Sequence, residues 1–135
     1  MSDAIEQLLP HRAPMRFIRE LIECTDTMAI ATARFTEKDF PVHENAVLES
    51  ALVECVAQTV AAALGKRAQA AGDKESDHGM LVAISGFKIV SRPPIGKELR
   101  IETREIKRLG LMLLVSGKIF CDGQTVAAGE LTLYA

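Results

Sequence analysis

The chain has 135 residues, which is the size of one domain and enough to bury a hydrophobic core. Sixteen basic and 18 acidic residues give a net charge of −2, so the charge balance does not favour nucleic acid as a partner. Hydrophobic residues at 48% and charged residues at 25% are ordinary values for a globular protein and argue against disorder. We therefore expect a single domain over residues 1–135.

Several classes of protein are disfavoured by the sequence. No apolar run approaches the roughly 20 residues that a membrane-spanning helix needs, and residues 1–10 lack the order of a signal peptide. We therefore expect a cytoplasmic protein that does not contact a membrane. The three cysteines lie far apart and the three histidines show no metal-ligand spacing. The sequence thus predicts reduced thiols, no metal and no cofactor.

The first half of the chain changes from a strand period to a helix period. Residues 28–35 alternate between two faces, which predicts a strand, and residues 15–24 form a less regular strand candidate. Apolar residues then recur at three- and four-residue steps, which predicts a helix over residues 46–71. Asn45 is the expected N-cap, and either Gly65 or Gly72 is expected to end the helix.

The second half of the chain indicates four strands in succession. They cover about residues 80–90, 98–107, 111–121 and 125–134, and short turns rich in Gly and Pro connect them. The alternation slips at Gly129, which predicts a bulge there.

These elements predict an α+β architecture. The helix is apolar on nearly all sides, so we expect one curved antiparallel sheet to wrap around it. Such a sheet has unpaired edges, and pairing with a second copy would cover them.

Two motifs give the sequence a resemblance to a known family. Leu9-Pro10-His11-Arg12-Ala13-Pro14-Met15 precedes the strands, and Glu54-Cys55-Val56-Ala57-Gln58 lies inside the long helix. The chain resembles the hotdog-fold 3-hydroxyacyl-[acyl-carrier-protein] dehydratases, and within them the ApeP type of the aryl polyene gene clusters. The resemblance implies a hotdog fold and a dimer formed by sheet extension.

The resemblance also implies an active site at the interface between two subunits. His43 would be the base that removes a C2 proton from the thioester substrate. Glu54 of the other subunit would handle the departing hydroxyl. Backbone amides near the helix start, at Asn45, Ala46 and Val47, would bind the thioester carbonyl, and Gln58, one turn after Glu54, is a further substrate-binding candidate.

One departure from the family pattern leaves alternatives open. The family carries Gly-His-Phe-Pro-Gly before the helix, whereas here Phe40-Pro41 precede His43. Either His43 or Asp39 therefore takes the place of the family histidine. The leading hypothesis is dehydration of a 3-hydroxyacyl thioester linked to an acyl carrier protein. Hydrolysis of an acyl thioester, and a non-catalytic subunit of a dehydratase complex, are the alternatives.

The expected partners follow from the same hypothesis. The substrate carrier would be an acyl carrier protein or coenzyme A, and the protein partner a second copy or another hotdog chain. Arg92, Lys97, Arg100 and Arg104 would form a basic rim attractive to an acidic carrier. Alternating charge on the solvent face of a strand explains the same residues without a partner.

Overall fold

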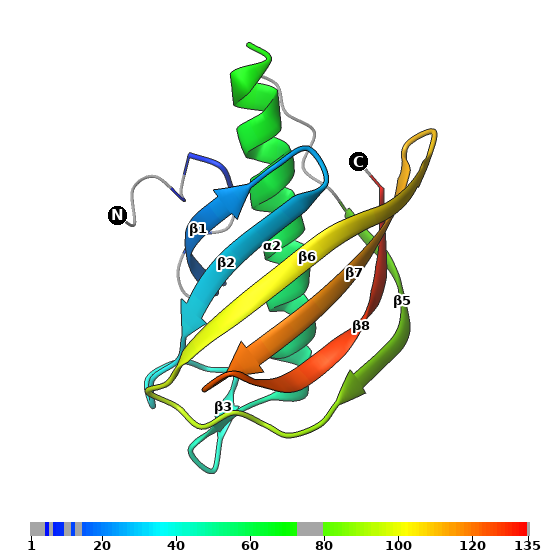
Figure 1. Ribbon diagram of the computed structural model, residues 1–135. Coiled ribbons are helices and arrows are strands. Elements are labelled where there is room, and N and C mark those ends of the chain that lie inside the picture. Colours follow the sequence, from blue (N-terminus) through cyan, green and yellow to red (C-terminus); the bar gives the residue numbers. More distant parts are fainter. Residues whose placement is uncertain (1–4, 6, 10–11, 13–14, 73–79, 135) are drawn as a thin grey trace.

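The computed structural model describes residues 5, 7–9, 12, 15–72 and 80–134. One long helix lies against a curved antiparallel sheet of six strands in the order β1-β2-β6-β7-β8-β5 (Figure 1). The predicted α+β hotdog architecture is therefore confirmed. In chain order the elements are β1 (Ile18–Cys24), β2 (Met28–Arg34), β3 (Val42–His43), β4 (Ala46–Val47), α2 (Glu49–Ala70), β5 (Met80–Ile89), β6 (Glu98–Leu109), β7 (Met112–Cys121) and β8 (Gln124–Tyr134).

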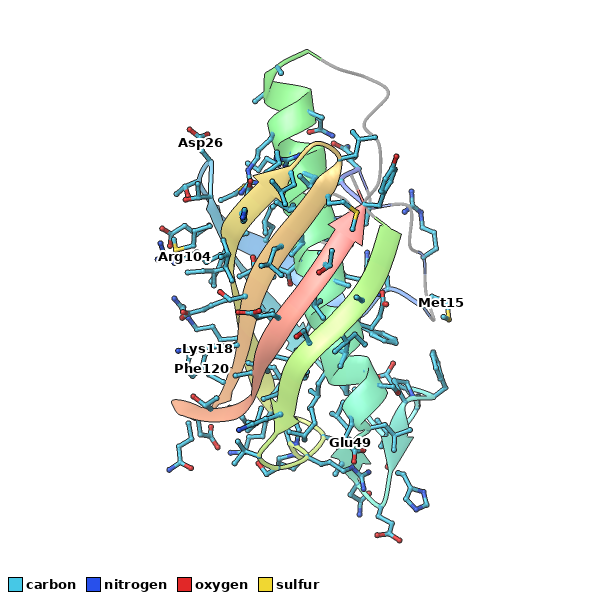
Figure 2. The ribbon with its side chains drawn as sticks, turned by 90° about the vertical axis from the view of Figure 1, so that its right-hand side faces the viewer. Met15, Asp26, Glu49, Arg104, Lys118 and Phe120 are labelled. Carbon is cyan, nitrogen blue, oxygen red and sulfur yellow. The ribbon has the colours of Figure 1, made fainter. Side chains whose placement is uncertain are left out.

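The two-residue period of the strands separates a buried face of the sheet from an outer face. On β6, Leu99 and Ile101 are buried, whereas the intervening Arg100 is exposed. Figure 2 shows Arg104, Lys118 and Phe120 projecting from the face of the sheet that is turned away from α2. The hydrophobic core therefore lies between the inner face of the sheet and the helix.

The helix packs closely on the inner face of the sheet. Leu52, Cys55 and Val56 are fully buried. Gly117 on β7 allows the close approach, because a Cβ at this position would lie 2.4 Å from a methyl carbon of Val56. Any larger residue at position 117 would push the helix away from the sheet.

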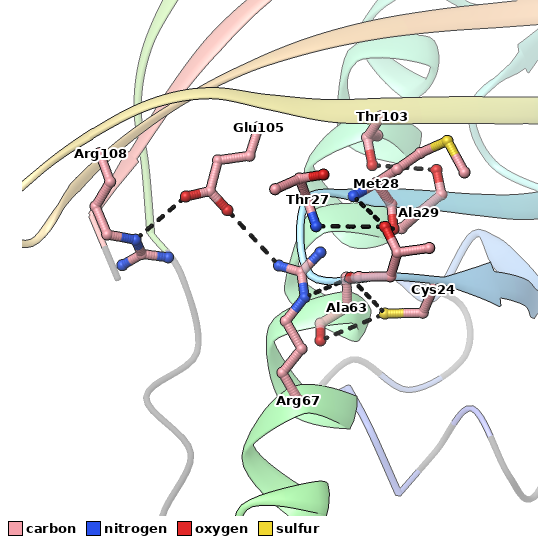
Figure 3. Close-up of polar contacts among 10 residues, drawn as sticks. Cys24, Thr27, Met28, Ala29, Ala63, Arg67, Thr103, Glu105 and Arg108 are labelled. Carbon is pink, nitrogen blue, oxygen red and sulfur yellow. Dashed lines mark hydrogen bonds and ion pairs between the residues drawn. The ribbon is translucent and has the colours of Figure 1, made fainter.

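The end of α2 is tied to the turn between β1 and β2 and to β6 (Figure 3). The Nε of Arg67 donates to the Thr25 carbonyl at 2.9 Å, and its Nη1 lies 3.8 Å from a carboxylate oxygen of Glu105. The helix ends at Ala70, and Gly72 follows with a φ of +80°. Of the two predicted ends, Gly72 is the one the structure uses, and Gly65 lies inside the helix.

The predicted N-cap at Asn45 is wrong. The helix begins at Glu49, and Leu48 is its N-cap, without a side-chain hydrogen bond. Glu44 and Asn45 instead take φ values of 53° and 62° and form the two-residue turn between β3 and β4. Asn tolerates this left-handed conformation well, so a tight hairpin occupies the place where the sequence predicted the first helical turn.

The predicted bulge at Gly129 is confirmed for the pairing of β8 with β5, where the extra residue is on β5, but not for the pairing of β8 with β7. Gly129 pairs in register with Gly117 on β7, and the shift between β7 and β8 falls instead at Val126. A second shift places Gly86 and Phe87 of β5 opposite Gly129. A Cβ at Gly129 would lie 2.3 Å from the Cα of Phe87, so the glycine serves a close approach by the neighbouring strand.

Candidate active site

Glu54 lies at the edge of a small, mostly apolar pocket. It stands on the second turn of α2, is partly buried, and faces a cavity of about 310 Å³. The lining residues come from the segment before β1, the segment before β3 and the first turns of α2: Met15, Phe17, Phe40, Pro41, Ser50, Ala51 and Glu54. The arrangement places one carboxylate against a surface suited to an apolar chain.

Gln58 connects the Glu54 carboxylate to the chain before β1. Its side chain is fully buried, and its Nε2 donates to Glu54 Oε2 at 3.0 Å and to the Met15 carbonyl at 2.8 Å. Its Oε1 accepts from the amides of Phe17 at 2.8 Å and Ile18 at 3.4 Å. Because the amide group is already saturated, we interpret Gln58 as a residue that positions Glu54. Its contact with substrate stays a prediction.

His43 lies outside the Glu54 pocket. It is on β3, its side chain is 66% exposed, and its Nε2 lies 3.4 Å from a carboxylate oxygen of Glu44. It is not among the residues that line the Glu54 cavity. Within one chain the structure therefore does not bring the two predicted catalytic residues together.

Asp39, the other candidate for the family histidine position, has a local structural contact. Its Oδ2 accepts hydrogen bonds from the Thr36 amide at 2.6 Å and the Thr36 hydroxyl at 3.3 Å. These bonds close the turn that leads into Phe40, which is 56% exposed and packs its ring against Phe17 at 5.8 Å. The turn that Asp39 stabilises thus positions Phe40, whose ring lines the pocket.

The three residues predicted to bind the thioester carbonyl form part of a hairpin. The Val47 amide donates to the Pro93 carbonyl at 2.9 Å, so it is not free to bind a substrate oxygen, and this part of the prediction is corrected. Asn45 is exposed at the turn and Ala46 is partly buried. A contact between these two residues and the substrate stays a prediction.

Arg92 anchors the same hairpin, a role that the sequence analysis did not predict. Its guanidinium donates to the carbonyls of His43 at 2.5 Å, Ala46 at 3.0 Å and Val47 at 3.1 Å. Arg92 follows β5 and is far from the hairpin in sequence, so no local pattern could pair them. These three carbonyl oxygens, which precede the first turn of α2, therefore already accept hydrogen bonds from Arg92.

The predicted basic rim is largely paired with acidic groups or backbone. Lys97 lies 3.3 Å from Asp122, and Arg100 lies 2.8 Å from Glu102, while Arg92 holds the hairpin. Arg100 and Lys97 border a wide hollow of about 750 Å³ on the outer face of the sheet, away from Glu54. The alternating-charge interpretation therefore describes these residues well.

Cys55, next to Glu54 in sequence, is not a nucleophile at this site. It is fully buried in the hydrophobic core and does not line the Glu54 pocket. Burial, and secondarily the charge of Glu54, raises the pKa of the Cys55 thiol far above its usual value. The thiol therefore stays neutral and acts as a packing group.

His11, with most of the motif around it, lies outside the described part of the chain. Within the described residues, no three His, Cys, Asp or Glu side chains gather as a metal site would require. No helix in that part of the chain is long and apolar enough to cross a bilayer.

Comparison with known sequences gives matches along the whole chain. A family model described as ApeP-like, ApeP dehydratase, matches residues 3–135. The 3-hydroxyacyl-[acyl-carrier-protein] dehydratase FabZ of Streptococcus equi subsp. zooepidemicus is 32% identical over 136 residues, covering 95% of this chain and 92% of the relative. FabZ of Streptococcus gordonii is 30% identical, covering 96% and 94%.

Comparison with solved structures gives the same fold. The dehydratase heterocomplex ApeI:P from Xenorhabdus doucetiae matches with a TM-score of 0.88 and 19% identity, covering 96% of this chain and 89% of that chain. A hypothetical thioesterase from Streptococcus pneumoniae, solved with coenzyme A, matches with a TM-score of 0.67 and 12% identity, covering 85% and 83%. At these identities the structural likeness supports the fold alone.

Proposed function

Because the chain belongs to the ApeP-like dehydratase family, we propose that it acts in dehydration of a 3-hydroxyacyl thioester carried by an acyl carrier protein. The observation that carries the proposal is the Glu54 carboxylate, held by Gln58 at the edge of a pocket with mostly apolar walls. The acyl chain would lie against these walls, with its polar end at Glu54. The FabZ relatives, which are named for this reaction, support the choice of substrate.

In the proposed reaction a base removes a proton from C2, and the electron pair of the C2–H bond forms the C2=C3 double bond. The C3–O bond breaks, and Glu54 in its protonated form gives its proton to the departing hydroxyl, which leaves as water. The product is the 2-enoyl thioester, and the bond to the carrier stays intact. Proton exchange with solvent resets both groups.

The base would come from a second subunit. His43 is exposed at the β3–β4 hairpin and does not line the Glu54 pocket of its own chain. A second copy would contribute its own His43, whereas a different hotdog partner would contribute another imidazole. One similar structure is described as a dehydratase heterocomplex. This description supports a different hotdog partner as the source of the imidazole.

The test is an assay of Glu54→Gln with a 3-hydroxyacyl carrier-protein thioester, for the chain alone and with a co-expressed hotdog partner. We expect the substitution to lower kcat by about 100-fold or more, because general acid catalysis typically contributes 10²–10⁴-fold. Glu49→Gln is the matched control, since Glu49 is an exposed carboxylate on the same helix. Unchanged turnover in Glu54→Gln would remove Glu54 from the mechanism.

A second candidate, a non-catalytic subunit, is favoured by one observation. No imidazole lines the Glu54 pocket among the described residues. If this candidate is correct, neither Glu54→Gln nor His43→Ala in this chain will lower turnover by the assembled complex.

Release of a free thiol from a saturated acyl thioester, without loss of water, would instead indicate a thioesterase.

A further inference from the structure

Ser50 shares the Glu54 pocket and has no assigned role. It is the second residue of α2, is exposed, and lines the same cavity as Glu54. Ser50 and Glu54 are four residues apart, so their side chains lie on the same helix face with Cβ atoms about 5–6 Å apart. Among the described residues that line this cavity, they are the two with polar side chains, so polar atoms of a bound ligand near them would meet these two groups.

The Ser50 hydroxyl is not engaged by the helix. A serine or threonine inside a helix commonly donates to the carbonyl four residues earlier, and Thr59 does so in α2, to the Cys55 carbonyl at 2.8 Å. For Ser50 the corresponding carbonyl is that of Ala46, which already accepts a hydrogen bond from Arg92. Within the described part of the chain the Ser50 hydroxyl makes no hydrogen bond, and it is therefore available to a ligand.

We propose that Ser50 binds the 3-hydroxyl group of the substrate together with Glu54. A hydroxyl oxygen between the two side chains can hydrogen-bond to both at about 2.8 Å, given the spacing of the helix positions. Ser50 would hold the C3–O bond in place, while Glu54 supplies the proton that accompanies its cleavage. This inference rests on the proposed function, because it assumes a ligand with a hydroxyl at C3.

A Ser50 hydroxyl in this role makes the pocket selective for hydroxylated acyl groups. A saturated acyl thioester of the same length fills the same apolar space but has no oxygen for Ser50 to bind. The effect of removing the Ser50 hydroxyl should therefore depend on which ligand is present. A purely structural role for Ser50 would affect both ligands equally.

The experiment measures binding of two pantetheine thioesters by calorimetry in the non-reacting Glu54→Gln background. One ligand is the 3-hydroxyacyl thioester and the other is the saturated acyl thioester of the same chain length. We expect Ser50→Ala to weaken binding of the hydroxylated ligand about 3- to 10-fold, the range of one hydrogen bond, and to leave binding of the saturated ligand unchanged. Ser50→Thr, which keeps a hydroxyl, should retain most of the affinity.

Ser116→Ala is the matched control, because Ser116 is on β7 and does not line the Glu54 cavity. Equal losses for both ligands, or no loss for either, would overturn the role of Ser50. In one outcome, the wild-type protein does not dehydrate the thioester while Ser50→Ala abolishes the preference for the hydroxylated ligand. In that case the proposed function fails and the Ser50 assignment stands. If dehydration is observed and Ser50→Ala leaves the preference unchanged, the proposed function stands and the Ser50 assignment fails.

Discussion

At the scale of single residues, Gln58 shows how one buried amide group organises the site. It is fully buried and hydrogen-bonds to Met15, Phe17, Ile18 and Glu54. Gln58→Leu keeps the volume but leaves buried backbone groups without partners, each at about 1–3 kcal/mol. We expect the free energy of unfolding, measured by urea denaturation, to fall by about 2 kcal/mol or more. Gln69→Leu is the matched control, because Gln69 is exposed on the same helix and makes one bond, to the Gln7 carbonyl at 3.1 Å. Equal effects of the two substitutions would contradict this account.

At the scale of elements, the β3–β4 hairpin depends on a side chain from outside it. The Arg92 guanidinium binds three hairpin carbonyls, and Arg92 is only partly exposed, so these charged hydrogen bonds are stronger than exposed ones. We expect Arg92→Ala to speed amide hydrogen exchange at residues 42–48 by about tenfold or more, the equivalent of about 1.4 kcal/mol, while exchange in β6 and β7 stays unchanged. Lys97→Ala is the control, because its pair with Asp122 is largely exposed and contributes at most about 1 kcal/mol. Uniform acceleration across the sheet would indicate global destabilisation instead of hairpin opening.

At the scale of the whole molecule, the edge strand β5 carries an apolar side chain, Ile84, that stays exposed to solvent in a single subunit. Ile84 is 52% exposed although it lies opposite the fully buried Leu131, on the helix side of the sheet. The sequence predicts that a second subunit extends the sheet, and this exposed side chain makes β5 the edge at which we expect the extension. We expect Ile84→Lys to shift the assembly toward monomer in sedimentation velocity. Ile106→Lys is the control, because Ile106 is similarly exposed, at 49%, but lies on β6. A dimer that persists in Ile84→Lys would place the interface elsewhere.

Most of the element types could be predicted from the sequence because they depend on neighbours along the chain. The alternation over residues 28–35 and the three- and four-residue steps after residue 46 each give their element directly. The same helical period places Ser50, Glu54 and Gln58 on one face of α2, and in the structure Ser50 and Glu54 line one pocket. The N-cap was misplaced at Asn45 because Asn fits both a helix N-cap and a left-handed turn, and the sequence around it does not distinguish the two.

By itself, the sequence determined which segments form strands and helix and which residues share a helix face, because the periods of two and 3.6 residues are local properties of the backbone. The tertiary structure decided which distant groups meet: Arg92 at the hairpin, Phe87 over Gly129, and Met15 and Phe40 around Glu54. These contacts join segments that are far apart along the chain, and only the packing of the sheet around the helix brings them together.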